Sequence, residues 1–429
     1  IDNYSLVKIM ADPGGFFSVH YAVEPEKLSI YSYEETYSVN LEIYGKISDL
    51  NGKTVYQFQK KAPLEFTQEQ LPELKKKRFS LQDAFPLISG HYRFDLLVKN
   101  TVSKEFTSLE KDITIPQSPA SLHLSPLILS PKVRTYEPQR EGQRPFQFGS
   151  LQLYPPAQKN FTLSDSLYVY FQMNGLNKEL KERGAVDFSI FKFQETEKVK
   201  TLTRKIKEMG SKTECLQKFS LQNFRPGEYT IRVSVLDKNM NEVLHEQENF
   251  YISLTASIPR AWSLSEVNPP SDDPSYSSLL GDQYLNKGEM DKALALLEKA
   301  YRKRPQSLKY ALAYSKANYI LGEHQKVKQV LMPFSSQAEK ESAVYFYLGK
   351  SSQKLGQFEE AISYYKQYLS HFGTHLGILN SIGDCYYQSG DKEEALRAWE
   401  RSLEIDPKQE EIKKRVDSLK KPQSQKIGL

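Results

Sequence analysis

Phosphate binding and metal binding are the first kinds of chemistry that the residue spacing raises. Residues 348–351 read Leu-Gly-Lys-Ser, which matches the end of a phosphate-binding loop, but that loop needs a glycine where this chain has Val344. His371 and His375 have the spacing of two metal ligands. However, Gly373 predicts a helix end between them, and no third ligand is evident. The spacing therefore favours neither a nucleotide site nor a zinc site.

Other catalytic signatures are also missing from the sequence. It has no Gly-x-Ser-x-Gly elbow, no His-Glu-x-x-His pair and no glycine-rich dinucleotide turn. The two cysteines, Cys215 and Cys385, fall in different predicted domains, which excludes a disulfide framework and a cysteine-rich zinc site. A single bridge between them, and their oxidation state, stay open. We therefore predict no catalytic residue, no cofactor and no metal, and hence a protein that is not an enzyme.

Charge and hydropathy argue against a nucleic-acid partner and against a membrane span. Lys+Arg 58 nearly balance Asp+Glu 53 over 429 residues. No stretch approaches the ~18 apolar residues of a transmembrane helix. Two basic clusters are interpreted as solvated surface, because no aromatic stacking residues are interleaved with them. These clusters are Lys75, Lys76, Lys77 and Arg78, and in the tail Lys413, Lys414, Arg415, Lys420 and Lys421.

A repeat with a period of 34 residues organises the C-terminal third of the chain. Four consecutive segments superimpose at that step without an insertion. The third keeps most of the shared positions, and the second is degenerate, with Val327 where alanine is expected. Over 274–407 these residues resemble the tetratricopeptide (TPR) family. The first and fourth segments carry the pattern as Leu280, Gly281, Tyr284, Gly288, Ala293, Leu297, Ala300 and Pro305, and as Ile382, Gly383, Tyr386, Gly390, Ala395, Trp399, Ser402 and Pro407.

Helix packing explains the pattern. Gly281, Gly349 and Gly383 are expected to let the first helix of a unit approach the second, and a later glycine in each unit is expected to end a helix in the left-handed conformation. One unit cannot bury its apolar face alone, so the units must stack and a last helix must cover the end. Residues 408–421 are predicted to be this cap, and 422–429 a tail.

The resemblance implies that partners bind in a concave groove lined by the first helix of each unit. Lysines beside aromatic side chains suit an extended peptide with acidic groups, although solvated helix faces carry the same residue types. The asparagine and lysine pattern of the family's chaperone-tail carboxylate clamp is not reproduced. By family register the predicted groove residues are Lys309, Leu312, Lys316, Tyr319, Phe346, Lys350, Gln353, Asn380, Asp384 and Tyr387.

Upstream of the repeats the hydrophobic pattern alternates, as it does in strands. Runs such as 37–44 place every second side chain on an apolar face, and Asn51-Gly52 between two runs predicts a hairpin turn. The two halves of this region share a Phe-Ser-Leu-Gln segment, which favours two β-sandwiches of similar design. Gly-x-Tyr at Tyr92 and Tyr229 resembles the tyrosine corner of immunoglobulin-like sandwiches, which would make both tyrosines core residues.

The predicted architecture is therefore a multidomain β + α chain, with two immunoglobulin-like or fibronectin-like β-sandwiches followed by an α-helical TPR solenoid. Segments rich in proline, serine and charge are expected to be linkers that allow relative domain motion. The expected boundaries are sandwich one at 1–117, a linker at 118–148, sandwich two at 149–256, a linker at 257–273, four TPR units at 274–407, the cap at 408–421 and the tail at 422–429.

Three stretches, 97–107, 145–149 and 167–171, resemble a group of bacterial envelope proteins that join a GWxTD domain to β-sandwiches and TPR units. No Gly-Trp-x-Thr-Asp motif occurs in this chain. The resemblance implies no catalytic role, and it implies a location in the periplasm, outside the cell or at the cell surface. The chain starts at Ile1 rather than Met, so we expect an export signal, and any GWxTD domain, to have preceded it.

The expected function is a non-enzymatic scaffold or adaptor in the bacterial cell envelope. It would bind other proteins in the TPR groove, either as an extended peptide or as a subunit of a membrane-associated complex. Two alternatives stay open. One is a carbohydrate-binding or cell-wall-binding module, because aromatic-rich sandwiches often bind glycans. The other is an accessory arm of an enzyme whose catalytic domain precedes residue 1.

Overall fold

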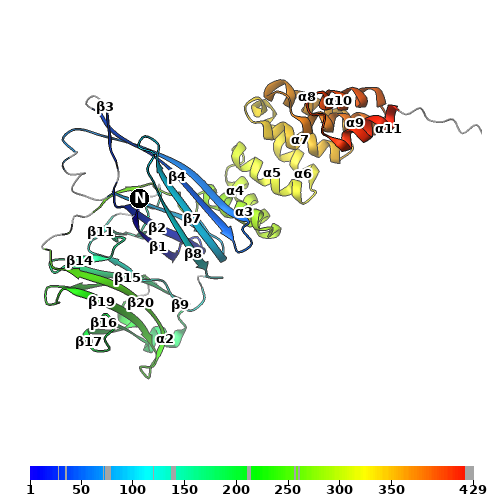
Figure 1. Ribbon diagram of the computed structural model, residues 1–429. Coiled ribbons are helices and arrows are strands. Elements are labelled where there is room, and N and C mark those ends of the chain that lie inside the picture. Colours follow the sequence, from blue (N-terminus) through cyan, green and yellow to red (C-terminus); the bar gives the residue numbers. More distant parts are fainter. Residues whose placement is uncertain are drawn as a thin grey trace, which may run out of the picture. The chain divides into compact units, whose positions relative to one another are not determined.

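The computed structural model divides into two compact units, Ile1–Tyr276 and Ser277–Leu429. It describes residues 1–420 except 28, 34–35, 71, 73–78, 119, 137–141, 210–213, 256–257 and 259–260. The basic residues 75–78, Lys421 and the expected tail lie outside the described residues. The first unit is rich in strands and the second is helical, which confirms the predicted order of β and α regions (Figure 1).

Two facing sheets form the N-terminal part of the first unit. Tyr21 and Phe85 on one sheet meet Phe94 on the other, with ring centroids 5.3 and 5.6 Å apart, so the core lies between the sheets. One sheet has the order β1-β2-β6-β21, and in the other β4 lies between β5 and β7, with β3 and β8 added. The strands are β1 (Asn3–Ala11), β2 (Phe17–Pro25), β3 (Tyr31–Tyr33), β4 (Thr36–Asp49), β5 (Thr54–Phe66), β6 (Phe79–Leu87), β7 (Gly90–Asn100), β8 (Phe106–Ile115) and β21 (Trp262–Ser265).

A second pair of sheets follows, with a small third sheet beside it. Phe188 contacts Phe171 and Phe219 across the pair, each at 5.9 Å. One sheet has the order β14-β20-β19-β16-β17, the facing sheet joins β9, β10 and β18 to β15, and the small sheet is β11-β13-β12. The elements are β9 (His123–Leu124), β10 (Ile128–Ser130), β11 (Val133–Thr135), β12 (Gln147–Phe148), β13 (Leu151–Leu153), β14 (Asn160–Thr162), β15 (Ser166–Asn174), α2 (Lys178–Arg183), β16 (Ala185–Lys192), β17 (Lys198–Lys205), η1 (Ile206–Met209), β18 (Glu214–Ser220), β19 (Gly227–Leu236) and β20 (Glu242–Ser253).

Local signals in the sequence are confirmed in this unit. Residues 37–44 lie in β4, and Gly52 has a φ of 79° in the hairpin that joins β4 to β5. Tyr92 and Tyr229 are buried, and their hydroxyls donate to the carbonyls of Ser89 at 2.9 Å and Arg225 at 2.7 Å. Both tyrosines are therefore core residues that fix the chain just before their own strand.

The linker expected at 118–148 is wrong over much of its length. β9 and β10 both pair with β15, so this segment supplies edges to a sheet. Leu6 and Tyr170, from the two sheet pairs, share one buried cluster with Phe146. Because these contacts join both sheet pairs into one compact unit, the relative motion expected between two separate sandwiches is not supported. The sequence missed these strands because two or three residues carry no alternation.

Buried polar groups reinforce this junction. The ammonium of Lys8 on β1 pairs with Glu248 on β20, and Lys159 reaches the same carboxylate at 2.5 Å. Burial raises the pKa of Glu248, but the two lysines outweigh it and the net effect is a lowered pKa. His20 is fully buried, which lowers its pKa to about 3, and its Nδ1 accepts the backbone N–H of Phe146 at 2.9 Å. A neutral His20 is therefore a satisfied core residue.

The linker expected at 257–273 also contains structure. β21 adds to β6 in parallel, and Trp262 packs on Phe66 and Phe79 with ring centroids 5.4 and 4.7 Å away. Further along, the hydroxyl of Tyr276 donates to the carboxylate of Asp12 at 2.6 Å. The chain that leads to the helices is thus an integral part of the first unit.

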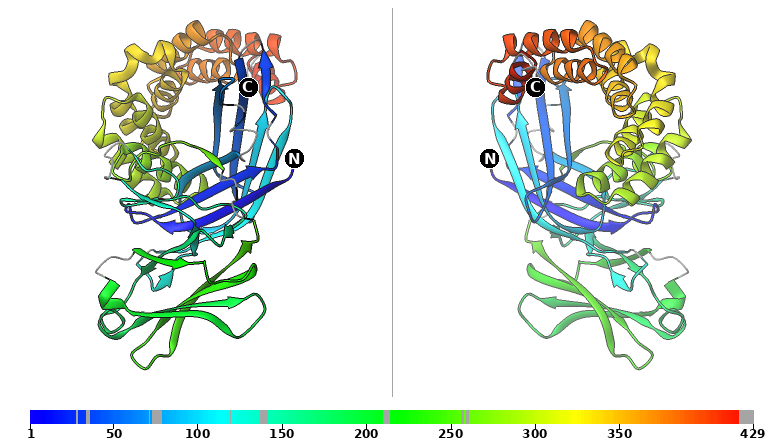
Figure 2. Two further views of the ribbon diagram at one scale, coloured as in Figure 1. Left: turned by 90° about the vertical axis from the view of Figure 1, so that its left-hand side faces the viewer. Right: turned by 90° about the vertical axis from the view of Figure 1, so that its right-hand side faces the viewer.

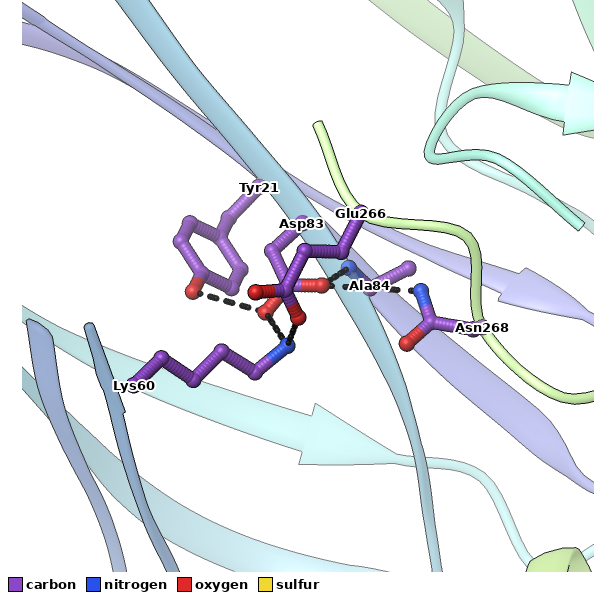
Figure 3. A network of polar contacts seen from close by, with 6 residues as sticks. All are labelled: Tyr21, Lys60, Asp83, Ala84, Glu266 and Asn268. Carbon is purple, nitrogen blue, oxygen red and sulfur yellow. Dashed lines mark hydrogen bonds and ion pairs between the residues drawn. The ribbon is translucent and has the colours of Figure 1, made fainter. Parts of the chain in front are cut away.

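A partly buried ion network holds this segment in place (Figure 3). The Lys60 ammonium on β5 lies 2.7 Å from the carboxylates of both Asp83 on β6 and Glu266 just after β21. The Tyr21 hydroxyl donates to the Asp83 carboxylate at 3.3 Å, and the Asn268 side-chain amide donates to the same carboxylate at 3.5 Å. Asp83 is almost fully buried, so loss of these partners would leave a buried carboxylate unpaired. The network therefore ties β5, β6 and the segment after β21 together.

The second unit consists of helical pairs that follow one another along an arc (Figure 2). First helices start at 274, 308, 342, 376 and 410, and second helices at 290, 324, 358 and 392, so both sets step by 34 residues as predicted. The helices are α3 (Pro274–Lys287), α4 (Met290–Lys303), α5 (Leu308–Ile320), α6 (His324–Leu331), η2 (Met332–Lys340), α7 (Ser342–Lys354), α8 (Phe358–Phe372), α9 (Leu376–Gln388), α10 (Lys392–Ile405) and α11 (Glu410–Lys420).

Glycines set both the turns and the close packing of these pairs. Gly288, Gly322, Gly356 and Gly390 all have φ between 75° and 93°, which confirms their predicted role at helix ends. A Cβ on Gly349 would lie 2.5 Å from the Tyr365 ring of the same unit. The equivalent Gly281 and Gly383 are blocked in the same way, by Leu297 at 2.7 Å and by Trp399 at 2.3 Å.

The ends and the weakest unit also match the sequence. Ile412 and Val416 of α11 are buried against Trp399, so this helix covers the last unit as predicted. In the degenerate second unit α6 ends at Leu331, and Pro333 lies in the 3₁₀ segment η2 that follows. Proline removes a backbone donor, which explains why this second helix is shorter than the others.

We expect Lys60→Ala to destabilise the first unit by about 3 kcal/mol, because it leaves the buried Asp83 carboxylate without its cation. Urea unfolding followed by Trp262 fluorescence in a Trp399→Phe background measures this. The control is Lys61→Ala, whose side chain is 72% exposed and which should change stability by less than about 0.5 kcal/mol. Equal effects of the two substitutions would contradict the role given to the network.

We expect Gly349→Ala to destabilise the helical unit by about 2 kcal/mol, because the added methyl group must displace the buried Tyr365 ring. Thermal unfolding followed by far-UV circular dichroism measures this. Gly377→Ala is the matched control, since its nearest neighbour is the exposed His375 side chain at 3.2 Å. That control should be neutral or stabilising by up to ~1 kcal/mol. An unchanged melting temperature for Gly349→Ala would refute the close-approach argument.

Candidate functional site

The ten predicted groove residues all lie on α5, α7 and α9, the first helices of three successive units. We call this set the A-helix face: Lys309, Leu312, Lys316, Tyr319, Phe346, Lys350, Gln353, Asn380, Asp384 and Tyr387. Lys309, Lys316 and Tyr387 are exposed, and the other seven are partly buried. The face is therefore present on the surface, but its members differ in how much of each side chain a partner could reach.

Four of these residues already make hydrogen bonds or ion pairs with neighbouring segments of the helical unit. The Lys350 ammonium donates to the Ser381 hydroxyl at 2.8 Å, and the Asn380 amide donates to Gln409 at 2.8 Å. Asp384 pairs with Arg415 of the capping helix. The fourth residue, Gln353, accepts the hydroxyl of Tyr365 of its own unit at 2.8 Å. Lys350 and Asp384 thus join neighbouring repeats, and Gln353 joins the two helices of one unit, so a role in packing accounts for these side chains before any partner is considered.

The open part of the face lies on α5 and at the start of α7. Lys316 is exposed, and the ammonium of Lys309 lies 5.7 Å from the ring of its neighbour Tyr310. Tyr319 and Phe346 both make edge-on contacts with Tyr347, at 5.6 and 5.3 Å. The second and third units thus bring two lysines and a group of partly exposed aromatic rings onto one face.

Charge on the face follows the repeat. Asp282, Lys316, Lys350 and Asp384 occupy one position in four successive units, each 34 residues from the next. Burial raises the pKa of Asp282, with Lys316 and Lys309 opposing that shift. Burial lowers the pKa of Lys350, with Asp384 opposing it. Lysine and aspartate thus face each other between the first and second units and between the third and fourth.

Sequence reasoning missed two members of this arrangement. The predicted groove residues begin in the second unit and so leave out Asp282, although the same 34-residue step points to it directly. Arg415 was read as part of a solvated basic tail, but it pairs with Asp384 and lies over the Trp399 ring at 5.8 Å. Nothing in its local sequence indicates this contact, because the partner belongs to the preceding unit.

A buried ion pair supports the junction between the second and third units. The Lys328 side chain of α6 is 8% exposed and pairs with Glu360 of α8. It also donates to Gln357 at 2.6 Å, and Ser352 donates to Glu360 at 3.2 Å. Such a pair is weak evidence for stability, but it fixes one register between the two units. The aromatic part of the A-helix face depends on that register.

The remaining chemical motifs have packing roles. The Leu-Gly-Lys-Ser segment lies inside α7, and His375 caps α9 by accepting the backbone N–H of Ile378. His371 stacks on Tyr345 with the rings 5.8 Å apart, and Gly373, with φ 81°, ends α8 between the two histidines. Within the described ranges, no cluster of three or more His, Cys, Asp or Glu residues is placed to hold a metal ion.

Both cysteines are free and buried. Burial raises the pKa of each thiol, Cys215 and Cys385, to about 12, so neither is an activated nucleophile. Among the described helices, none combines the length and the apolar character needed to cross a membrane.

Comparison with known proteins identifies the repeats. The sequence model of the family described as Tetratricopeptide repeat matches residues 340–408, which cover the third and fourth units. No curated protein matches the chain. With the 34-residue step of the helices, the family match establishes that the C-terminal region carries TPR units.

Solved structures similar to this chain each cover about a third of it. One structure of MamA (MSR-1) is 26% identical, covering 32% of this chain and 78% of that chain with a TM-score of 0.31. MamA from Desulfovibrio magneticus RS-1 is 17% identical, covering 32% and 77% with a TM-score of 0.31. TTC0263, a thermophilic TPR protein in Thermus thermophilus, is 21% identical, covering 34% and 81% with a TM-score of 0.29.

Proposed function

We propose that this protein is a non-enzymatic scaffold that binds other proteins on the A-helix face of its TPR units. The observation that carries the proposal is the open part of that face, which contains the exposed lysines Lys309 and Lys316 and the partly exposed rings of Tyr319 and Phe346. Stacked TPR units are suited to holding an extended segment, because successive first helices repeat along one surface.

The chemistry of the open part favours an acidic peptide that also carries aromatic or apolar side chains. Two exposed ammonium groups can form charge-assisted hydrogen bonds with carboxylates. Partly exposed rings offer flat contact area of the kind found at binding hot spots. By contrast Lys350, Asn380 and Asp384 are held by neighbouring helices, so they would contribute to binding mainly by shaping the surface.

The finer architecture and location belong to the same proposal. Tyr92 and Tyr229 make the phenol-to-backbone hydrogen bonds expected of tyrosine corners, which supports assigning the two sheet pairs to immunoglobulin-like or fibronectin-like sandwiches. The resemblance of residues 97–107, 145–149 and 167–171 to envelope proteins of the GWxTD-associated group supports a place in the bacterial cell envelope.

The binding proposal predicts a charge-dependent interaction. Fluorescence anisotropy of a labelled peptide rich in Asp, Glu and Phe should show saturable binding to the full chain. Lys316→Glu should weaken it about tenfold, ~1.4 kcal/mol, because it replaces attraction by repulsion. The matched control is Lys299→Glu, an exposed lysine on α4 outside the A-helix face, which should bind like the unmodified chain. Equal binding by all variants, Lys309→Glu included, would refute the assignment of the site.

The envelope proposal predicts the location of the native protein. Fractionation of the producing cells, with detection by an antibody against the helical unit, should place the protein in the periplasm, in the medium or on the cell surface. Protease treatment of intact cells separates surface exposure from a periplasmic location. Recovery with a cytoplasmic marker enzyme would contradict the proposal and would leave peptide binding untouched.

A further inference from the structure

A hollow of about 700 Å³ lies on the sheet that contains β4, on the face turned away from the core. Ile43, Ile47 and Phe94 of the same strands are buried on the opposite face. Because successive side chains of a strand point to opposite faces, the residues between them line the hollow. They include Tyr44, Lys46, Gln57, Arg93, Asp95 and Glu110.

Strand pairing brings these side chains into a flat array. Lys46 lies opposite Gln57 on β5 and opposite Asp95 on β7, and Asp95 lies opposite Glu110 on β8. One row across four strands therefore presents an amide, an ammonium and two carboxylates. In the adjacent row, Tyr44 on β4 lies between Gln59 on β5 and Leu97 on β7.

Hydrogen bonds hold the planar groups of this array in place. The Arg93 guanidinium donates to Asp95 at 2.8 Å and to Glu110, and the Tyr44 hydroxyl donates to Glu42 at 2.7 Å. The Gln57 side chain makes no hydrogen bond to another described residue, and it is exposed. The array thus combines fixed acceptors and donors with at least one uncommitted amide, as a preorganised polar site requires.

Charge balance identifies the kind of ligand. The hollow is lined by two cations, Lys46 and Arg93, and by two anions, Asp95 and Glu110, so its net charge is zero. A phosphate or a polyanion would meet the carboxylates, and a cation would meet the lysine and arginine. A neutral ligand with many groups that both donate and accept hydrogen bonds fits best.

We propose that this hollow binds a neutral oligosaccharide, a role that goes beyond the peptide binding of the A-helix face. Sugar hydroxyls can donate to Asp95 and Glu110 and can accept from Arg93, Lys46 and the Gln57 amide. The Tyr44 ring supplies a face against which the C–H groups of a sugar ring pack. A protein partner fits less well, because interface centres are poor in charged residues, whereas four charged side chains line this hollow.

Isothermal titration of the full chain with neutral hexasaccharides of glucose, mannose and N-acetylglucosamine tests the proposal, with a hexasaccharide of galacturonic acid as the charged arm. At least one neutral sugar should bind with a Kd below about 1 mM. Tyr44→Ala and Gln57→Ala should each weaken binding at least about fivefold. The Gln57 side chain makes no hydrogen bond to another described residue, so weaker binding by Gln57→Ala cannot be attributed to unfolding.

Glu65→Ala is the control, because Glu65 is exposed on the same face of β5 but outside the hollow. It should bind the neutral sugar like the unmodified chain. No binding of any neutral sugar, binding of the acidic sugar alone, or equal binding by Gln57→Ala would each overturn the proposal. Lys316→Glu on the helical unit should leave sugar binding unchanged, which separates this result from the test of peptide binding.

Discussion

The helical unit depends on the distance at which the two helices of each pair approach. That distance is set where a ring or a branched side chain of the second helix lies directly on a glycine of the first, as Tyr365 does on Gly349 and Trp399 on Gly383. Any side chain at the glycine would separate the helices and open the core. The packing of one unit on the next, and the surface formed by successive first helices, follow from this contact.

The same constraint made the helical unit readable from sequence. Glycines, alanines and aromatic rings recur in the helical unit because the two helices of each pair pack together through residues that are close in sequence. The 34-residue step therefore indicates where the helices start and where they end. The sequence predicts the β region less well where the two strands of a pair are far apart along the chain. β10 is three residues long and joins β15, and β21 joins β6 from far along the chain. Such short strands have no periodic pattern, and their proline-rich and serine-rich surroundings resemble linkers.

The sequence predicts on which helices the groove residues lie, but not which side chains they contact. Family register placed all ten residues on first helices, as the structure does. It could not show that Lys350 reaches Ser381 or that Asp384 pairs with Arg415, because those contacts join side chains from different units. The distinction matters for function, since side chains that already hold neighbouring units, such as Lys350 and Asp384, can change partner only at a structural cost.

The parallel pairing of β21 with β6 has a consequence for how the chain matures. Trp262 and its neighbours leave the ribosome after both pairs of sheets, yet they complete the edge of a sheet whose other strands are made first. Without these residues β6 has an unpaired edge, a surface on which strands of other chains can add. The edge of this sheet is therefore completed by the segment that leads into the first TPR helix, so a chain cut before Trp262 would expose it.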